Sequence, residues 1–150
     1  MIRPFLATVA LALGATAVLA QADAIKERNQ LMSALWREGL RPVAQIARGA
    51  EQYDRDVVAK SFDRMEQIAV RLPPLWPAGT IVEKPETRFY SAPRIWQNKA
   101  DFDAKLAEMT AAIKANRERA LAGPEGVQAA YKAVDDSCNA CHEFYRLRAQ

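Results

Sequence analysis

The last part of the chain combines a helical repeat with a cofactor-attachment pattern, and this combination most narrowly limits the fold. Apolar and cysteine residues recur there at alternating intervals of four and three: Val127, Tyr131, Val134, Cys138, Cys141 and Tyr145. Such a repeat places its members along one side of an α-helix that packs against other helices. We therefore predict a helix over about residues 124–148 whose buried side carries both cysteines of the chain.

The two cysteines belong to the run Cys138-Asn139-Ala140-Cys141-His142, which ends on the sole histidine of the chain. The pattern C-x-x-C-H is the attachment signature of c-type haem, in which two thiols bond to the haem vinyl groups and the imidazole ligates the iron. Positions i, i+3 and i+4 of a helix project from one face, so one turn presents all three side chains to the same porphyrin. The pattern predicts one covalent haem c on Cys138 and Cys141, with His142 as an axial ligand.

Three other uses of a C-x-x-C pair fit this chain less well. A thioredoxin-like redox motif requires a βαβ context, and no strand pattern competes with the helical repeats. A structural zinc site requires four ligands and a catalytic site three plus water. The motif supplies three, and the chain has no other Cys or His to complete the set. A simple disulfide would leave His142 without a role.

The N-terminus predicts export. Arg3 supplies a positive charge, residues 5–19 form a short apolar run, and small residues follow. This is the organisation of a secretory signal peptide, which we assign to residues 1–20, with cleavage at 20–22. A retained anchor is the alternative, but the apolar run is shorter than the roughly 20 residues that a spanning helix needs. Residues 21–150 then form a single periplasmic domain without a membrane span, and export suits haem attachment, which needs reduced thiols and an extracytoplasmic assembly site.

Size and charge add two limits. The 150-residue chain, without its signal peptide, is long enough for one hydrophobic core. With 21 basic and 18 acidic residues, the net charge is +3 at pH 7, and this weak balance does not argue for nucleic-acid binding.

Three helical segments precede the motif, at about residues 23–48, 54–72 and 99–121. Their apolar residues recur with helical spacing. The stripes are Ile25, Met32, Leu35, Gly39, Val43 and Ile46; then Val58, Phe62, Met65, Ile68 and Leu72; then Phe102, Leu106, Met109 and Ile113. The four segments predict an all-α, antiparallel up-down-up-down bundle. Because the cysteines lie on the seam of the last helix, we expect the haem inside this bundle.

Local signals mark where these helices begin, bend and end. Asp23 is the expected N-cap of the first helix and Gly49 its stop. Pro42 lies within it and is expected to kink it. Pro73-Pro74 ends the second helix, and Gly123-Pro124 separates the third from the fourth.

A long connection joins the second and third helices over about residues 73–98. It holds five prolines and the aromatic residues Trp76, Phe89, Tyr90 and Trp96. Loops of this length are unusual in compact domains and are often functional. Two interpretations stay open: a crossover that caps the end of the bundle with aromatic rings, or a lid that covers the haem or shapes a partner surface.

A C-terminal C-x-x-C-H motif in an exported four-helix chain resembles the class II cytochromes c, the group of cytochrome c′ and cytochrome c-556. The resemblance covers nearly the whole mature chain, with matches in order at residues 24–32, 49–54, 91–96 and 142–146. It implies the four-helix fold, one haem c, electron transfer and redox partner proteins in the periplasm. It also leaves a homodimer open, because many relatives pair through their first two helices.

The family divides at the sixth coordination position of the iron. Cytochromes c′ are typically five-coordinate and bind NO or CO, whereas in the c-556 type a methionine of the first helix ligates the iron. The resemblance aligns Met32 with this position, and the run Gln30-Leu31-Met32 is similar to the c-556 type. A methionine on an apolar stripe also serves as core filling, which explains Met65 and Met109. We expect His142 and Met32 as axial ligands of an electron carrier; the alternative is a five-coordinate binder of NO or CO.

Two arginines lie near these residues in the sequence. Arg28 precedes the candidate methionine by one helical turn, and the resemblance implies that it pairs with a haem propionate; the alternative is a solvated helix face. Arg146 follows His142 by one turn, where it would contact a propionate, set the electrostatics beside the imidazole, or complement the helix C-terminus. Tyr145 and Trp96 are interpreted as packing residues. No catalytic residue is predicted, so the chain is expected not to be an enzyme.

Overall fold

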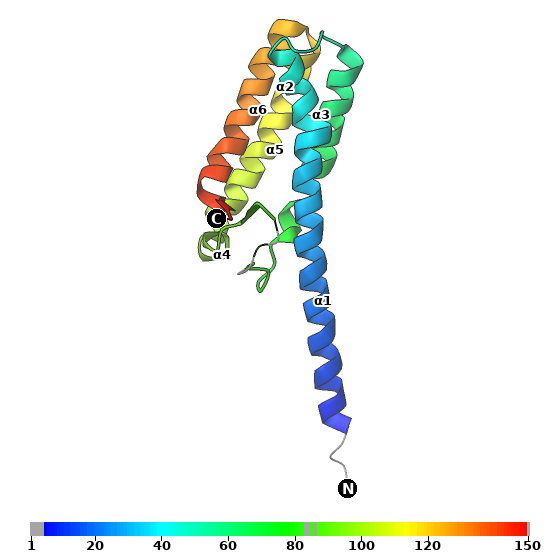
Figure 1. Cartoon of the computed structure of the whole chain (residues 1–150), viewed down its shortest axis with the longest axis vertical. Helices are drawn as coiled ribbons and strands as arrows, with labels where there is room; N and C mark the ends of the chain where they lie inside the picture. The colour runs from blue at the N-terminus through cyan, green and yellow to red at the C-terminus, as the bar shows by residue number, and fades with distance from the viewer. Residues whose placement is uncertain (1–4, 83–84, 86, 150) are drawn as a thin grey trace.

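The computed structural model describes residues 5–82, 85 and 87–149, with side chains from residue 19 onward. Its helices are α1 (Phe5–Ala34), the π-helix η1 (Leu35–Leu40), α2 (Arg41–Ala47), α3 (Arg55–Ala69), the 3₁₀-helix η2 (Pro73–Leu75), α4 (Arg94–Gln97), α5 (Lys99–Leu121) and α6 (Pro124–Tyr145). Two short strands are β1 (Phe89–Ser91) and β2 (Arg146–Arg148). Figure 1 shows α1, η1 and α2 as one continuous rod beside α3, α5 and α6, with neighbours in sequence running in opposite directions. The predicted four-helix bundle is confirmed.

The two middle helices follow their sequence signals closely. Asp54 is the N-cap of α3, since its Oδ1 accepts hydrogen bonds from the main-chain N–H groups of Asp56 at 2.8 Å and Val57 at 3.1 Å. The predicted end of α3 at residue 72 is three residues too late, because the chain turns before Pro73-Pro74 and enters η2. The bounds of α5 match the prediction, and Gly123, with a φ of 137° that glycine tolerates, separates it from α6.

The start of the first helix was predicted wrongly. No break occurs at Asp23, because α1 extends without interruption from Phe5 to Ala34. The residues before Asp23 are largely alanine and leucine, which favour helix and provide no stop signal. No described helix is long and apolar enough to cross a membrane. The predicted stop at Gly49 is confirmed: α2 ends at Ala47, and Gly49 has a φ of 73°.

A π-helical turn directly precedes Pro42, where the first helix was expected to kink. The N–H of Arg41 bonds to the carbonyl of Trp36, five residues earlier, and Pro42 follows directly. Proline lacks an N–H and crowds the carbonyl four residues before it, so a wider preceding turn accommodates the ring. The same turn approaches α3 closely, since a Cβ on Gly39 would lie 2.4 Å from Cγ of Met65. The lack of a side chain at Gly39 therefore permits this contact.

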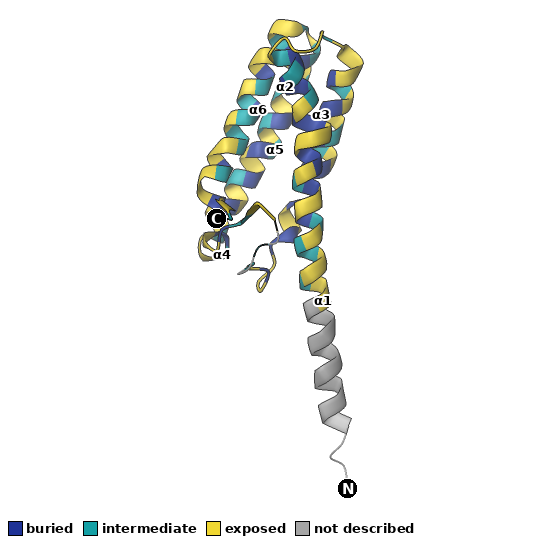
Figure 2. Ribbon diagram, viewed as in Figure 1, coloured by how far each residue is buried: buried dark blue, intermediate teal, exposed yellow. Residues whose placement is uncertain are grey.

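The hydrophobic core lies along the inward-facing sides of the first rod, α3, α5 and α6. Figure 2 shows buried positions facing inward and exposed positions facing outward on each of them. The stripes predicted for the second and third helices are entirely buried: Val58, Phe62, Met65, Ile68, Leu72, Phe102, Leu106, Met109 and Ile113. On α6, Val127, Val134, Cys141 and Tyr145 are buried, while Tyr131 and Cys138 are partly buried against the core.

A two-stranded sheet ties the long connection to the end of α6. Strands β1 and β2 pair antiparallel, with Tyr90 opposite Leu147. No strand was predicted, and the predicted last helix extended to residue 148; instead α6 ends at Tyr145 and β2 follows it. Main-chain groups flanking the strands continue the pairing, because Ala92 N–H donates to Tyr145 O and Ala149 N–H to Arg88 O, each at 2.9 Å. The C-terminal backbone thus has partners in the crossover.

Candidate cofactor site

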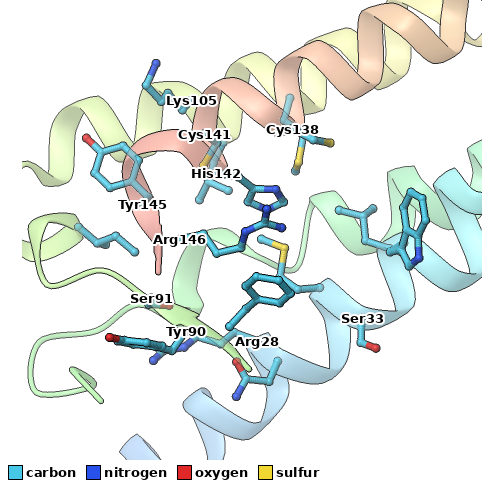
Figure 3. A pocket seen from close by; sticks show the side chains of 18 of the residues that line it. Arg28, Ser33, Tyr90, Ser91, Lys105, Cys138, Cys141, His142, Tyr145 and Arg146 are labelled. Atoms are coloured by element: carbon cyan, nitrogen blue, oxygen red, sulfur yellow. The ribbon is translucent and has the colours of Figure 1, made fainter. Parts of the chain in front are cut away.

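A cavity of about 700 Å³ lies between the first rod, the crossover, α5 and α6. In Figure 3, Arg28 and Ser33 of α1 lie across it from Cys138 and Cys141 of α6. Most of its walls are apolar or aromatic, from Leu35, Leu40, Trp76, Ile95, Phe102, Leu106, Met109 and Tyr145. An apolar cavity with a few polar groups is the usual form of a cofactor site.

The motif residues converge as their spacing predicts. Cys138, Cys141 and His142 all line this cavity from the last turns of α6. Burial, assisted by the charge of Asp135, raises the pKa of the Cys138 thiol to about 11. Burial also raises the pKa of Cys141. Both cysteines are therefore neutral thiols at neutral pH.

His142 is held in its neutral form. Burial, followed by the positive charge of Arg146, lowers the pKa of His142 to about 4. A neutral imidazole has a nitrogen lone pair free to bind a metal, so His142 is ready to act as a ligand without first losing a proton.

Two methionines, rather than one, line the cavity. Met32 of α1 is partly buried against the core, and Met109 of α5 is buried. Sequence reasoning assigned Met109 to packing alone, because its stripe also forms the core and gave no sign that part of it faces a cavity. Met65 packs against Gly39, in agreement with the packing role expected for it.

Arg28 is buried, so its interpretation as part of a solvated helix face is wrong. It is 2% exposed, and its Nη1 and Nη2 donate to Thr80 Oγ1 at 3.1 Å and to Thr80 O at 2.9 Å. Its guanidinium lies 6.0 Å from the ring centroid of Trp76 and 5.7 Å from that of Trp96. Burial lowers the pKa of Arg28 to about 10, which leaves it charged at neutral pH. Its Nε is buried without a hydrogen-bond partner.

Arg146 lies beyond the last helical turn, as the first residue of β2. Its exposed guanidinium lies 4.7 Å from the ring of Phe89, and Figure 3 shows it next to His142 at the cavity. Of its three predicted roles, the charge beside the imidazole agrees with its effect on the pKa of His142.

Aromatic packing extends from the cavity into the crossover. The Tyr145 ring meets Phe102 edge to face at 5.2 Å, and its hydroxyl donates to Asp101 Oδ2 at 2.5 Å. Trp96 Nε1 donates to Pro77 O at 2.9 Å. The packing roles predicted for Tyr145 and Trp96 are confirmed.

Sequence reasoning missed Thr80 and the π-turn. The partner of Thr80 is 52 residues away, so no local pattern marks it. Leu35 and Trp36 of η1 line the cavity, and Pro42 was the only local sign of a changed helical register there.

The residues present fit a covalently bound haem. Two neutral thiols, a neutral imidazole and two thioethers face one cavity with apolar walls. The buried Nε of Arg28 lacks an acceptor, which a carboxylate of the cofactor would supply. A helical bundle with this donor set around an internal cavity defines a c-type cytochrome of the four-helix class.

Comparison with known proteins places the chain within this class. The family model described as Cytochrome C' matches residues 23–146. The chain therefore belongs to the cytochrome c′ family, the class II cytochromes c, whose members carry one covalently attached haem c.

The relatives match over nearly their whole length. Cytochrome c-555 of Bradyrhizobium diazoefficiens is 28% identical over 148 residues, which cover 99% of each chain. Cytochrome c-556 of Rhodopseudomonas palustris is 29% identical over 147 residues, or 97% of each chain. Among solved structures, a cytochrome c′ from Rhodobacter spheriodes aligns with a TM-score of 0.78 at 23% sequence identity. The alignment covers 86% of this chain and 98% of that one, and it shows that the two share a fold.

Proposed function

We propose that this protein is a periplasmic monohaem electron carrier. In it, Cys138 and Cys141 bind the haem covalently, and His142 and Met32 ligate its iron. The observation that carries the proposal is the convergence of these four side chains, from opposite ends of the sequence, on one apolar cavity. The family match begins at residue 23, directly after the expected signal peptide, which supports export of the remaining chain.

A haem bound here supplies a one-electron couple between ferric and ferrous iron. His142 would bind the iron as a neutral imidazole, and the soft thioether of Met32 would favour the ferrous state, which would raise the reduction potential relative to a second histidine. The apolar walls limit water around the iron and tune the same potential. If Met32 ligates the iron, no ligand site would remain for a substrate, which would suit electron transfer and not catalysis.

Arg28 is proposed to pair with a haem propionate. Its charge is already buried beside the cavity, and its Nε has no acceptor. A carboxylate would satisfy this nitrogen while the two Nη atoms keep their bonds to Thr80. Arg146 is proposed to act through its charge beside His142.

The sixth ligand is tested by the absorption spectrum of the purified holoprotein, with and without CO. We expect a low-spin ferric spectrum with a far-red band from thioether-to-iron charge transfer, and no rapid CO binding after reduction. Met32→Ala should give a high-spin iron that binds CO. Met109→Leu is the matched control, because it removes the other thioether of the cavity, and it should leave the band in place.

Two outcomes would contradict this ligand assignment. A high-spin wild-type protein that binds CO rapidly would favour the five-coordinate gas binder. Loss of the far-red band in Met109→Leu but not in Met32→Ala would move the ligand from α1 to α5.

Covalent attachment is tested by denaturation. The double variant Cys138→Ser, Cys141→Ser should lose its haem in denaturant, whereas Ser137→Ala, a neighbouring change that keeps both thiols, should retain it. Haem that stays on the doubly substituted chain would refute the attachment sites.

A homodimer through the first rod and α3 also stays a prediction. Sedimentation of the holoprotein would measure it.

A further inference from the structure

We propose that the acidic surface of a redox protein docks over the mouth of the cavity. The docking surface, called here the cationic rim, consists of exposed or half-exposed residues that line this cavity: Trp36, Arg37, Arg88, Phe89, Lys105 and Arg146. The inference rests on the proposed function, because docking there brings a partner close to the electron only if the cavity holds the redox centre.

Positively charged residues outnumber negatively charged ones among the described residues that line the cavity. Five are cationic, namely Arg28, Arg37, Arg88, Lys105 and Arg146, and one, Asp135, is acidic. The two propionates of a haem would offset two of these positive charges, so the mouth stays positive with the cofactor bound. Glu143 is exposed next to Arg146, and Glu83 and Glu86 lie outside the described residues.

The four cations of the rim have no ion-pair partner in the described part of the chain. Carboxylates elsewhere pair with other cations: Glu38 with Arg64, Glu27 with Arg71, Asp103 with Lys99, Asp63 and Glu66 with Arg117, and Asp136 with Lys132. Unpaired cations around a cavity mouth attract the carboxylates of another molecule and speed its approach.

Exposed aromatic rings lie among these cations. Trp36 is 45% exposed and Phe89 is 42% exposed. The guanidinium groups of Arg88 and Arg146 lie 5.2 Å and 4.7 Å from the ring of Phe89. Tryptophan and arginine are enriched at the binding centres of protein interfaces, where apolar area adds to charge.

The same features disfavour a second copy of this chain as the occupant. A twofold symmetric contact would place the rim against itself and bring like charges together. An anionic membrane would also attract the cations, but a partner protein with its own redox centre explains why the rim surrounds the cavity and not another part of the surface.

The test measures electron transfer from the reduced holoprotein to an acidic blue-copper protein by stopped flow, over a range of salt concentrations. The rate should fall as salt rises, since salt screens the attraction. The double variant Arg37→Gln, Lys105→Gln should react roughly three- to tenfold more slowly at low salt and show a flatter salt dependence. The control Lys60→Gln, Lys114→Gln removes the same charge from exposed sites outside the rim and should match the wild type.

Reduction of the wild type by dithionite and its reoxidation by hexacyanoferrate(III) separate the two proposals. If these small reagents cannot cycle the protein between its two redox states, the carrier function itself fails. If they cycle the protein but the rim variant transfers electrons to the acidic protein as fast as the control, the docking surface is overturned and the carrier function stands. Binding of the wild type, but not the rim variant, to anionic phospholipid vesicles, with unchanged protein-to-protein rates, would overturn it in favour of a membrane surface.

Discussion

Tyr145 joins the motif helix to the start of α5 through a hydroxyl that donates to Asp101. Burial and this hydrogen bond raise the pKa of Tyr145 from 10.0 to about 12. An unfolded chain releases this proton near pH 10, while the folded chain keeps it, so the contribution of Tyr145 to stability is complete below pH 10 and is lost as the pH rises to about 12.

We therefore expect Tyr145→Phe to lower the free energy of unfolding at neutral pH and to weaken the loss of stability above pH 10. Denaturant unfolding at several pH values, together with tyrosinate absorbance, measures both effects. Tyr53→Phe is the control for loss of a hydroxyl, because Tyr53 donates to a main-chain carbonyl, that of Leu121. Alkaline curves of identical slope for Tyr145→Phe and the wild type would contradict the expectation.

At the level of single residues, predictability depended on distance in sequence. The spacing of Cys138, Cys141 and His142 placed them on one cavity correctly, because one helical turn fixes their relative positions. The burial of Arg28 was not predictable in this way, since it depends on Thr80, which reaches α1 only through the folded crossover.

Among the elements, the π-helix η1 has the clearest structural cause and effect. Pro42 follows it, and Gly39 within it contacts α3 at a distance that excludes a Cβ. Leu35 and Trp36 of this turn line the same cavity as Met32. The turn therefore also sets which side of the first rod faces the cavity.

Gly39→Ala is expected to destabilise the protein by about 1–3 kcal/mol, because the added methyl overlaps Met65 in a closely packed core. This cost opposes the gain of up to about 1 kcal/mol that alanine brings to an ordinary helix. Chemical denaturation of Gly39→Ala, Met65→Ala and the double variant measures the coupling between the two sites. In the Met65→Ala background the second substitution should cost much less; equal costs in both backgrounds would remove the overlap as the cause.

Local signals predicted some element boundaries and not others. Gly49 and Gly123 marked the ends of α2 and α5, because a glycine acts within a few residues, whereas the expected cap Asp23 lies inside the uninterrupted helix α1. The pairing of β1 with β2 was missed, since each strand is three residues long and gains its partner only after the crossover has folded back on α6.

For the whole molecule, the described core lies beyond the expected signal peptide. The described core cluster begins at Leu31, and Arg28 is the earliest buried residue of the described side chains. A chain cleaved at residues 20–22 therefore keeps the core and the Arg28–Thr80 contact.

Mass spectrometry of the exported protein should give the mass of residues 21–150 or 23–150 plus one haem. Removal of the apolar run leaves the helical stripes intact, so the shortened chain should fold and bind its cofactor. A mass that includes residues 1–20 would show a retained anchor, and a mass of bare peptide would contradict covalent attachment.

The burial of Cys141 bears on the order of assembly. It is 8% exposed and lies on α6, which packs against α5. Once α6 has closed against α5, a lyase could no longer reach this sulfur. Ligation of the pigment must then precede final compaction, so the maturation enzymes would act on a nascent, still-open substrate and not on the finished bundle.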